Sequence, residues 1–323
     1  MSQNTDNSCA VRLRMLCLNK CAGIVLRQYD AEFKKRQHAS LSILKEFGFG
    51  KRLMEVRILR EVSDLVDRVR KRNGEPFDPD LTVTTSVANV VYSILFGKRL
   101  DCDGPRMARL VEIMHTMLGM NCPELDLLPL LRFIPAYRRR LESAIAHFNK
   151  FDVELQADIE GAMDENEPEN FTRNYADNEK DPLRIKLIIH DLVIAGTETS
   201  ASTLRWCLVL LANHPDIQAR LRKQIDSVVA SGERLPSLDD RPRLPYVEAA
   251  LLEVMRLKTL VPLAVPHKTI HDTEVGGYLI PAGTVVGKLY LSKFINAINS
   301  TRDNLQFSSA LRQCIIVQYK WRG

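Results

Sequence analysis

The sequence contains no uninterrupted apolar stretch of the roughly 18 residues that a membrane-spanning helix needs. Its longest apolar segment, residues 187–196, is broken by His190 and Asp191. The seven cysteines are an odd number and are scattered through a chain without a secretory leader, which indicates reduced thiols rather than a disulfide framework. We therefore expect an intracellular or cytosol-facing protein with no encoded membrane anchor.

A strong excess of one charge sign is also missing from the body of the chain. The net charge of +5 is carried by the ends, because residues 1–36 and 287–323 are both basic and the residues between them are slightly acidic. A nucleic-acid-binding face needs a basic stripe with aromatic platforms, and the body of the chain has neither, so we expect no nucleic-acid partner. With 323 residues, 45% of them hydrophobic, the chain can bury a large core, which excludes a disordered protein.

Apolar residues recur at intervals of three and four along most of the chain, which predicts a mainly α-helical fold. The expected helices cover residues 33–47, 52–71, 78–97, 136–163, 181–213, 215–229 and 245–257. Residues 105–120 are rich in methionine, a pattern more typical of adaptable core than of a ligand pocket. The acidic segment 164–181 is interpreted as a solvated loop.

Extended patterns with turn signals occur late in the chain, over residues 262–269 and 274–286. They predict a small β part beside the helices. Residues 1–22 have no clear period and are interpreted as a variable lead-in. Their cysteines stand without a histidine or a CxxC pair, so no metal site is predicted there.

The centre of the 181–213 helix combines small and polar residues from Ala195 to Ser200. Glycine and hydroxyl residues lower helix propensity, and a threonine hydroxyl can bond the carbonyl four residues back. One explanation is close packing of another element against Ala195 and Gly196. The other is a flat ligand on the same residues, with Glu198 and Thr199 supplying a proton path to bound oxygen.

Two later patterns are ambiguous by themselves. Glu253 and Arg256 share a helix face and could form an ordinary exposed pair. His267 ends the apolar run that starts at residue 262, and a lone histidine in that place is more often structural than a ligand.

Taken together, in this order and spacing, these motifs resemble the cytochromes P450, the haem-thiolate monooxygenases, and most closely the animal family 2 enzymes of the endoplasmic reticulum. The likeness rests on the segments 47–52, 96–99, 195–199, 245–248, 253–256, 262–267 and 277–284. It predicts a partial cytochrome P450 domain over residues 23–290, with a mainly α fold and a minor β part, followed by a divergent tail over 291–323.

The resemblance implies roles for single residues. It places the 181–213 helix across a haem, with Ala195 and Gly196 near the oxygen site and with Glu198 and Thr199 as the acid–alcohol pair that assists proton delivery. It also implies that Glu253 and Arg256 form a buried structural pair, and that His267 donates a hydrogen bond to a haem propionate.

The implied activity is the insertion of one oxygen atom from O₂ into an apolar organic substrate, such as a fatty acid or a xenobiotic. The implied cofactor is haem, and the implied partner is a flavin-containing reductase that draws electrons from NADPH. The implied location is the cytosolic face of the endoplasmic reticulum, while a chain with no anchor of its own would be cytosolic.

The sequence departs from the family pattern in two respects. Phe33 and Gln37 stand where the family has a tryptophan and a propionate-binding arginine, so Gln37 weakens charge pairing with the haem. After about residue 290 the cysteine-ligand loop is missing, and Cys314 has no glycines around it for such a loop, so we do not expect Cys314 to bind iron. The chain therefore reads as truncated at both ends.

Because the thiolate drives O–O cleavage, monooxygenation is not expected from the chain as it stands. One alternative is a non-catalytic variant without functional haem, which is unstable or acts through protein contacts. The other is a helical ligand-binding module without a metal.

Overall fold

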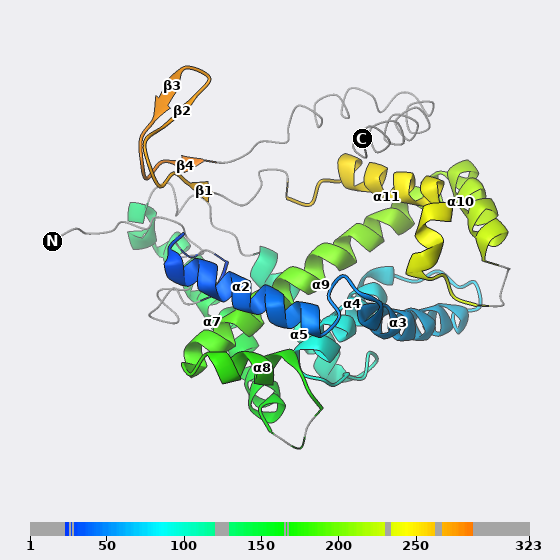
Figure 1. The fold of residues 1–323 in the computed structure, drawn as a ribbon, viewed down its shortest axis with the longest axis horizontal. Helices are drawn as coiled ribbons and strands as arrows, with labels where there is room; N and C mark the ends of the chain where they lie inside the picture. The colour runs from blue at the N-terminus through cyan, green and yellow to red at the C-terminus, as the bar shows by residue number, and fades with distance from the viewer. Residues whose placement is uncertain are drawn as a thin grey trace. The chain divides into compact units, whose positions relative to one another are not determined.

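The computed structural model describes residues 23–286, except residues 26, 28, 120–128, 165, 167, 230–233 and 262–266 (Figure 1). The lead-in 1–22 and the tail 291–323, including Cys314, lie outside the described residues. The chain divides into two compact units, Met1–Ala201 and Ser202–Gly323. No helix in the described part of the chain is long and apolar enough to span a membrane.

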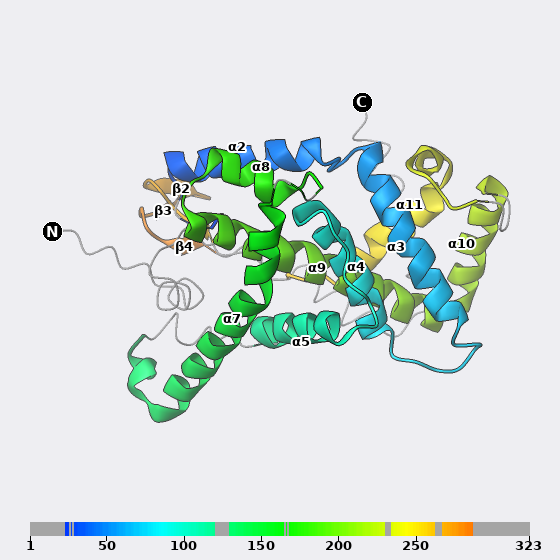
Figure 2. The ribbon, with the colours of Figure 1, turned by 90° about the horizontal axis from the view of Figure 1, so that it is seen from below.

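The first unit is made of helices around one apolar core (Figure 2). They are α2 (Ala31–Glu46), α3 (Arg52–Arg70), α4 (Pro79–Leu95), α5 (Pro105–Gly119), the 3-10 helix η1 (Pro129–Phe133), α7 (Pro135–Ala162), α8 (Phe171–Asn178) and the first part of α9 (Pro182–Asn213). Proline occupies the first turn of α4, α7 and α9, where its missing N–H costs no helical hydrogen bond.

The core of this unit has α9 at its centre. Ile188 and Ile189 of α9 are fully buried, as are Phe151 and Leu155 of α7. The methionine-rich segment contributes Met107 and Met114, both almost completely buried, so its interpretation as core is confirmed.

The interpretation of residues 164–181 as a solvated loop is wrong over its second half, because helix α8 lies there. Asn170 caps α8 by accepting a hydrogen bond from the Arg173 N–H at 3.0 Å. Phe171 and Tyr175, one turn apart, are buried with their rings stacked 5.6 Å apart. A two-turn helix between acidic flanks carries too few apolar residues to show a helical period.

The buried side of helix α4 is partly polar. Thr84, Thr85 and Asn89 are fully enclosed, whereas Val87 and Val90 are only half-buried. The Asn89 side chain donates to the Leu100 carbonyl at 2.8 Å and accepts from the Leu100 N–H at 2.9 Å. A buried amide that is paired in both directions fixes the loop after α4 without an unsatisfied polar group.

The second unit contains the end of α9, then α10 (Pro215–Val228), the 3-10 helix η2 (Leu238–Arg243), α11 (Pro245–Leu257) and four short strands. Strand β1 (His267–Lys268) pairs antiparallel with β4 (Val285–Val286), and β2 (Thr273–Val275) pairs with β3 (Tyr278–Ile280). Gly276 and Gly277 form the β2–β3 turn with φ of 60° and 84°, a conformation that favours glycine. The predicted mainly α fold with a small β part is confirmed.

A buried carboxylate ties three parts of the first unit together. Asp158 of α7 is 1% exposed and lies 2.7 Å from Lys98 Nζ and 2.6 Å from Arg106 Nη2. The Tyr92 hydroxyl donates to the same carboxylate at 3.4 Å. Burial, followed by the Asp158 charge, raises the pKa of Tyr92, so its phenol stays a neutral donor.

Asp158→Asn is therefore expected to lower the free energy of unfolding by about 2 kcal/mol, because it leaves Lys98 and Arg106 without their anion. The cations are partly exposed, which keeps the loss below that of a fully buried pair. Chemical denaturation measures it. The matched control is Glu142→Gln on the same helix, in an exposed pair with Arg138, where a change of at most about 0.5 kcal/mol is expected. Equal effects of the two substitutions would contradict the role given to Asp158.

Candidate functional site

The centre of α9 changes from buried to exposed within two turns. Val193 is fully buried, whereas Ala195 and Thr199, one turn apart on the same face, are exposed. A Cβ added to Gly196 would meet Val91 Cγ2 of α4 at 3.1 Å. The two explanations offered for these small residues thus apply to different residues: Gly196 allows close packing of α4, and Ala195 leaves an open surface.

The hydroxyl of Thr199 is held against its own helix. Its Oγ1 donates to the Ala195 carbonyl oxygen at 2.7 Å, the back-bond that a mid-helix threonine favours. Glu198 lies beside it, with its side chain 21% exposed. An acid and a hydroxyl therefore adjoin the open face of Ala195, an arrangement that can hold or pass a proton.

Sequence reasoning missed two residues of this site, His115 of α5 and Asp80 of α4. His115 Nε2 lies 3.0 Å from Glu198 Oε2, and His115 Nδ1 lies 3.9 Å from Asp80 Oδ2. The available signal was a histidine within the apolar stripe that includes Met114 and Met117. We assigned the methionine-rich segment to the core as a whole, and its histidine was therefore not considered as a site residue.

The other residues expected to contact haem lie on different elements. Gln37 is exposed on α2, next to the buried Arg36, and no contact in the described part of the chain joins Gln37 to the centre of α9. His267 is exposed in β1 of the second unit, where it pairs with Val286. The rest of its motif, residues 262–266, lies outside the described residues.

Glu253 and Arg256 form a two-point ion pair on α11. The Arg256 Nε and Nη2 atoms donate to the two Glu253 carboxylate oxygens at 2.7 Å and 2.6 Å. Glu253 is fully buried and Arg256 is 31% exposed. Spacing alone suggested an exposed pair, whereas the enclosed carboxylate makes this a stronger, charge-assisted contact.

A haem site requires an open flat surface and a side chain that donates to iron. The described residues provide such a surface but no thiolate that could donate to iron. The exposed edge at Ala195 and Thr199 suits a flat ligand. The free thiols in the described ranges are Cys102 and Cys207, and burial raises the pKa of both, so neither is a ready thiolate. No cluster of metal-ligating side chains is found within the described ranges either.

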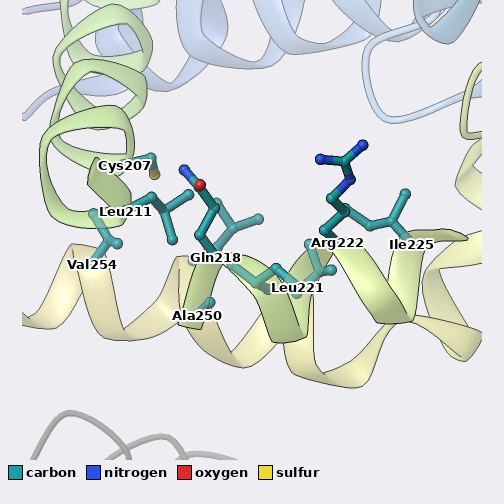
Figure 3. Close-up of a pocket in the computed structure, with 10 residues that line it drawn as sticks. Cys207, Leu211, Gln218, Leu221, Arg222, Ile225, Ala250 and Val254 are labelled. Atoms are coloured by element: carbon teal, nitrogen blue, oxygen red, sulfur yellow. The ribbon is translucent and has the colours of Figure 1, made fainter. Parts of the chain in front are cut away.

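The second unit has an apolar pocket of about 300 Å³ between the end of α9, α10 and α11 (Figure 3). It is lined by Cys207, Leu211, Gln218, Leu221, Arg222, Ile225, Val247, Ala250, Leu251 and Val254. In Figure 3 the Arg222 guanidinium points away from Ala250 and Val254. The lining offers apolar packing and no group poised for chemistry.

Glu253→Gln is expected to lower the free energy of unfolding by about 2–3 kcal/mol, because it removes the charge that balances a half-buried guanidinium. A urea titration followed by circular dichroism measures this. The control is Asp226→Asn in the exposed Arg222–Asp226 pair of α10, which should cost at most about 0.5 kcal/mol. A loss below about 1 kcal/mol for Glu253→Gln would refute a structural role for the pair.

Comparison with known proteins supports one family. The cytochrome P450 family model matches residues 15–292. Cytochrome P450 2F5 of Gorilla gorilla gorilla is 36% identical over 277 residues, which cover 81% of this chain and 56% of the relative. Cytochrome P450 2F3 of Capra hircus is 34% identical over 279 residues, with coverage of 82% and 56%. Cytochrome P450 2U1 of Rattus norvegicus is 33% identical over 290 residues, with coverage of 83% and 54%.

All three relatives are animal proteins that carry family 2 names. The chain spans about half the length of the curated relatives it matches. Its family match and its described fold extend over the same central stretch, so the likeness is not confined to a short motif. The chain belongs to the cytochrome P450 family and is similar to animal members of family 2.

Proposed function

We propose that the chain carries the oxygen-side surface of a haem-dependent monooxygenase that acts on an apolar organic substrate, such as a fatty acid or a xenobiotic. The observation that carries this proposal is the open edge at Ala195 and Thr199, with the Glu198 carboxylate beside it, in a chain of the cytochrome P450 family. Electrons would come from NADPH through a flavin-containing reductase at the cytosolic face of the endoplasmic reticulum.

The residues of α9 have different roles on this surface. Ala195 leaves space against the helix, while Gly196 brings α4 close enough to brace it. Thr199 keeps its hydroxyl oxygen at the edge by bonding the Ala195 carbonyl, and Glu198 holds or releases a proton next to it. When bound, haem with a thiolate ligand supplies the cleavage of the O–O bond.

Residues on other elements would support the same group. Gln37 offers an amide N–H to a propionate but no positive charge, and His267 offers a ring N–H. Glu253 and Arg256 would stabilise the core of the second unit. These assignments rest on the family motifs and on the exposure of Gln37 and His267.

A second candidate function is a non-catalytic role through protein contacts, and two observations favour it. The described part of the chain offers only protonated thiols, at Cys102 and Cys207. Leu204, Leu208 and Val209 on the second half of α9 are each more than 40% exposed, and exposed apolar side chains promote association.

The reduced carbon monoxide difference spectrum of the haem-supplied chain separates these functions. We expect the chain to retain haem and to give the shorter-wavelength Soret band of a carbonyl complex without a thiolate, because burial raises the pKa of Cys102 and Cys207 and Cys314 has no glycines around it for a ligand loop. The long-wavelength band of a thiolate complex would show that this chain forms a complete monooxygenase site and would overturn the expectation for Cys314. Failure to retain haem would contradict the proposed surface and favour the non-catalytic role.

A further inference from the structure

Three helices of the first unit bring an imidazole between two carboxylates. His115 of α5 places Nε2 at 3.0 Å from Glu198 of α9 and Nδ1 at 3.9 Å from Asp80 in the first turn of α4. The first distance is that of a close ion pair in which Nε2 and Oε2 do not meet the angles of a hydrogen bond, and the second is a longer charge contact. Among the described residues, Asp80 and Glu198 are the carboxylates that lie within 4 Å of the His115 ring nitrogens.

The exposure of His115 sets it apart from another histidine of this unit. His190 of α9 is fully buried against the rings of Phe148 and Phe151, so solvent does not reach it. The His115 side chain is 30% exposed. It therefore touches Glu198 with one nitrogen while its ring can exchange protons with solvent.

We propose that His115 is a positioning residue for Glu198, and that it links this carboxylate to solvent. This inference deepens the proposed function and rests on it where oxygen chemistry is concerned. A proton from solvent is taken up at Nδ1, and the proton on Nε2 passes to Glu198 Oε2 when a rotation of the side chains brings these two atoms into hydrogen-bond alignment. The ring stays neutral overall, Glu198 becomes the acid beside Thr199, and exchange with solvent restores the ring.

The charge state of the ring gives this arrangement a measurable property. A protonated imidazole bonds a carboxylate more strongly than a neutral one does, and histidine changes charge between about pH 5 and pH 8. A contact that only fills space would not depend on pH. The coupling between His115 and Glu198 should therefore be larger at about pH 5.5 than at about pH 8.5.

A double-mutant cycle on the full chain without haem tests this. His115→Phe keeps a ring, and Glu198→Gln keeps the side-chain length while removing its charge. Unfolding equilibrium constants of the wild type, both single variants and the double variant are compared at about pH 5.5 and about pH 8.5. We expect a coupling of roughly threefold to tenfold at the lower pH, and less than about twofold at the higher pH.

Two further variants make the result specific. His147→Phe on α7 is the matched control, because its ring bonds the Ser143 carbonyl of its own helix at 2.8 Å, and it should be additive with Glu198→Gln at both pH values. His115→Gln keeps an amide donor without a titratable ring. Its coupling to Glu198 should not change with pH, and it replaces His115→Phe if that variant does not fold.

Additive behaviour of His115 and Glu198 at the lower pH, or a coupling equal at both pH values, would overturn the proposal. Because the cycle needs no haem, its result is separate from that of the proposed function. Coupling in a chain that does not retain haem would support the histidine–carboxylate link and reject the monooxygenase. If the effects of His115→Phe and Glu198→Gln are additive in a chain that retains haem, the histidine–carboxylate link is rejected and the proposed function is not affected.

Discussion

Helix α9 is both the centre of the buried core and an exposed surface, and the packing of the first unit depends on this combination. Its 32 residues extend for about 48 Å. Ile188 and Ile189 have no exposed surface, yet Ala195 and Thr199, about two to three turns later, are open. Gly196 makes the change possible, because its missing side chain lets Val91 of α4 pack closely against the helix beside the open edge.

Polar contacts fix the positions of the surrounding helices relative to one another, which apolar contacts alone specify less strictly. Asp158 joins α7 to Lys98, Arg106 and Tyr92, and the Asn89 amide closes the loop after α4. Each of these buried groups is paired, so burial strengthens the contacts instead of penalising them. The Glu198 carboxylate is also mostly buried, and it lies 3.0 Å from His115. This contact restricts the position of the carboxylate beside the open surface.

The long helices and the family were predictable from the sequence, because apolar periodicity and motif spacing are local properties. Helix α8 was not predictable, since its buried residues Phe171 and Tyr175 are too few to form a period. The contact between His115 and Glu198 was also out of reach, because it joins residues far apart in the chain and depends on how α5 crosses α9. For Glu253 and Arg256, spacing suggested an exposed pair and the family resemblance implied a buried one, and the structure encloses the Glu253 carboxylate.

A haem titration of an Ala195→Leu variant tests whether the open edge at Ala195 lies against haem. The control is Ala146→Leu at an exposed position of α7. Fluorescence quenching and absorbance report binding, and chemical denaturation confirms that all three chains are equally folded. We expect haem affinity to fall at least roughly tenfold for Ala195→Leu alone, which corresponds to a loss of about 1.4 kcal/mol of binding free energy. Equal affinity in the wild type and in both variants would contradict it.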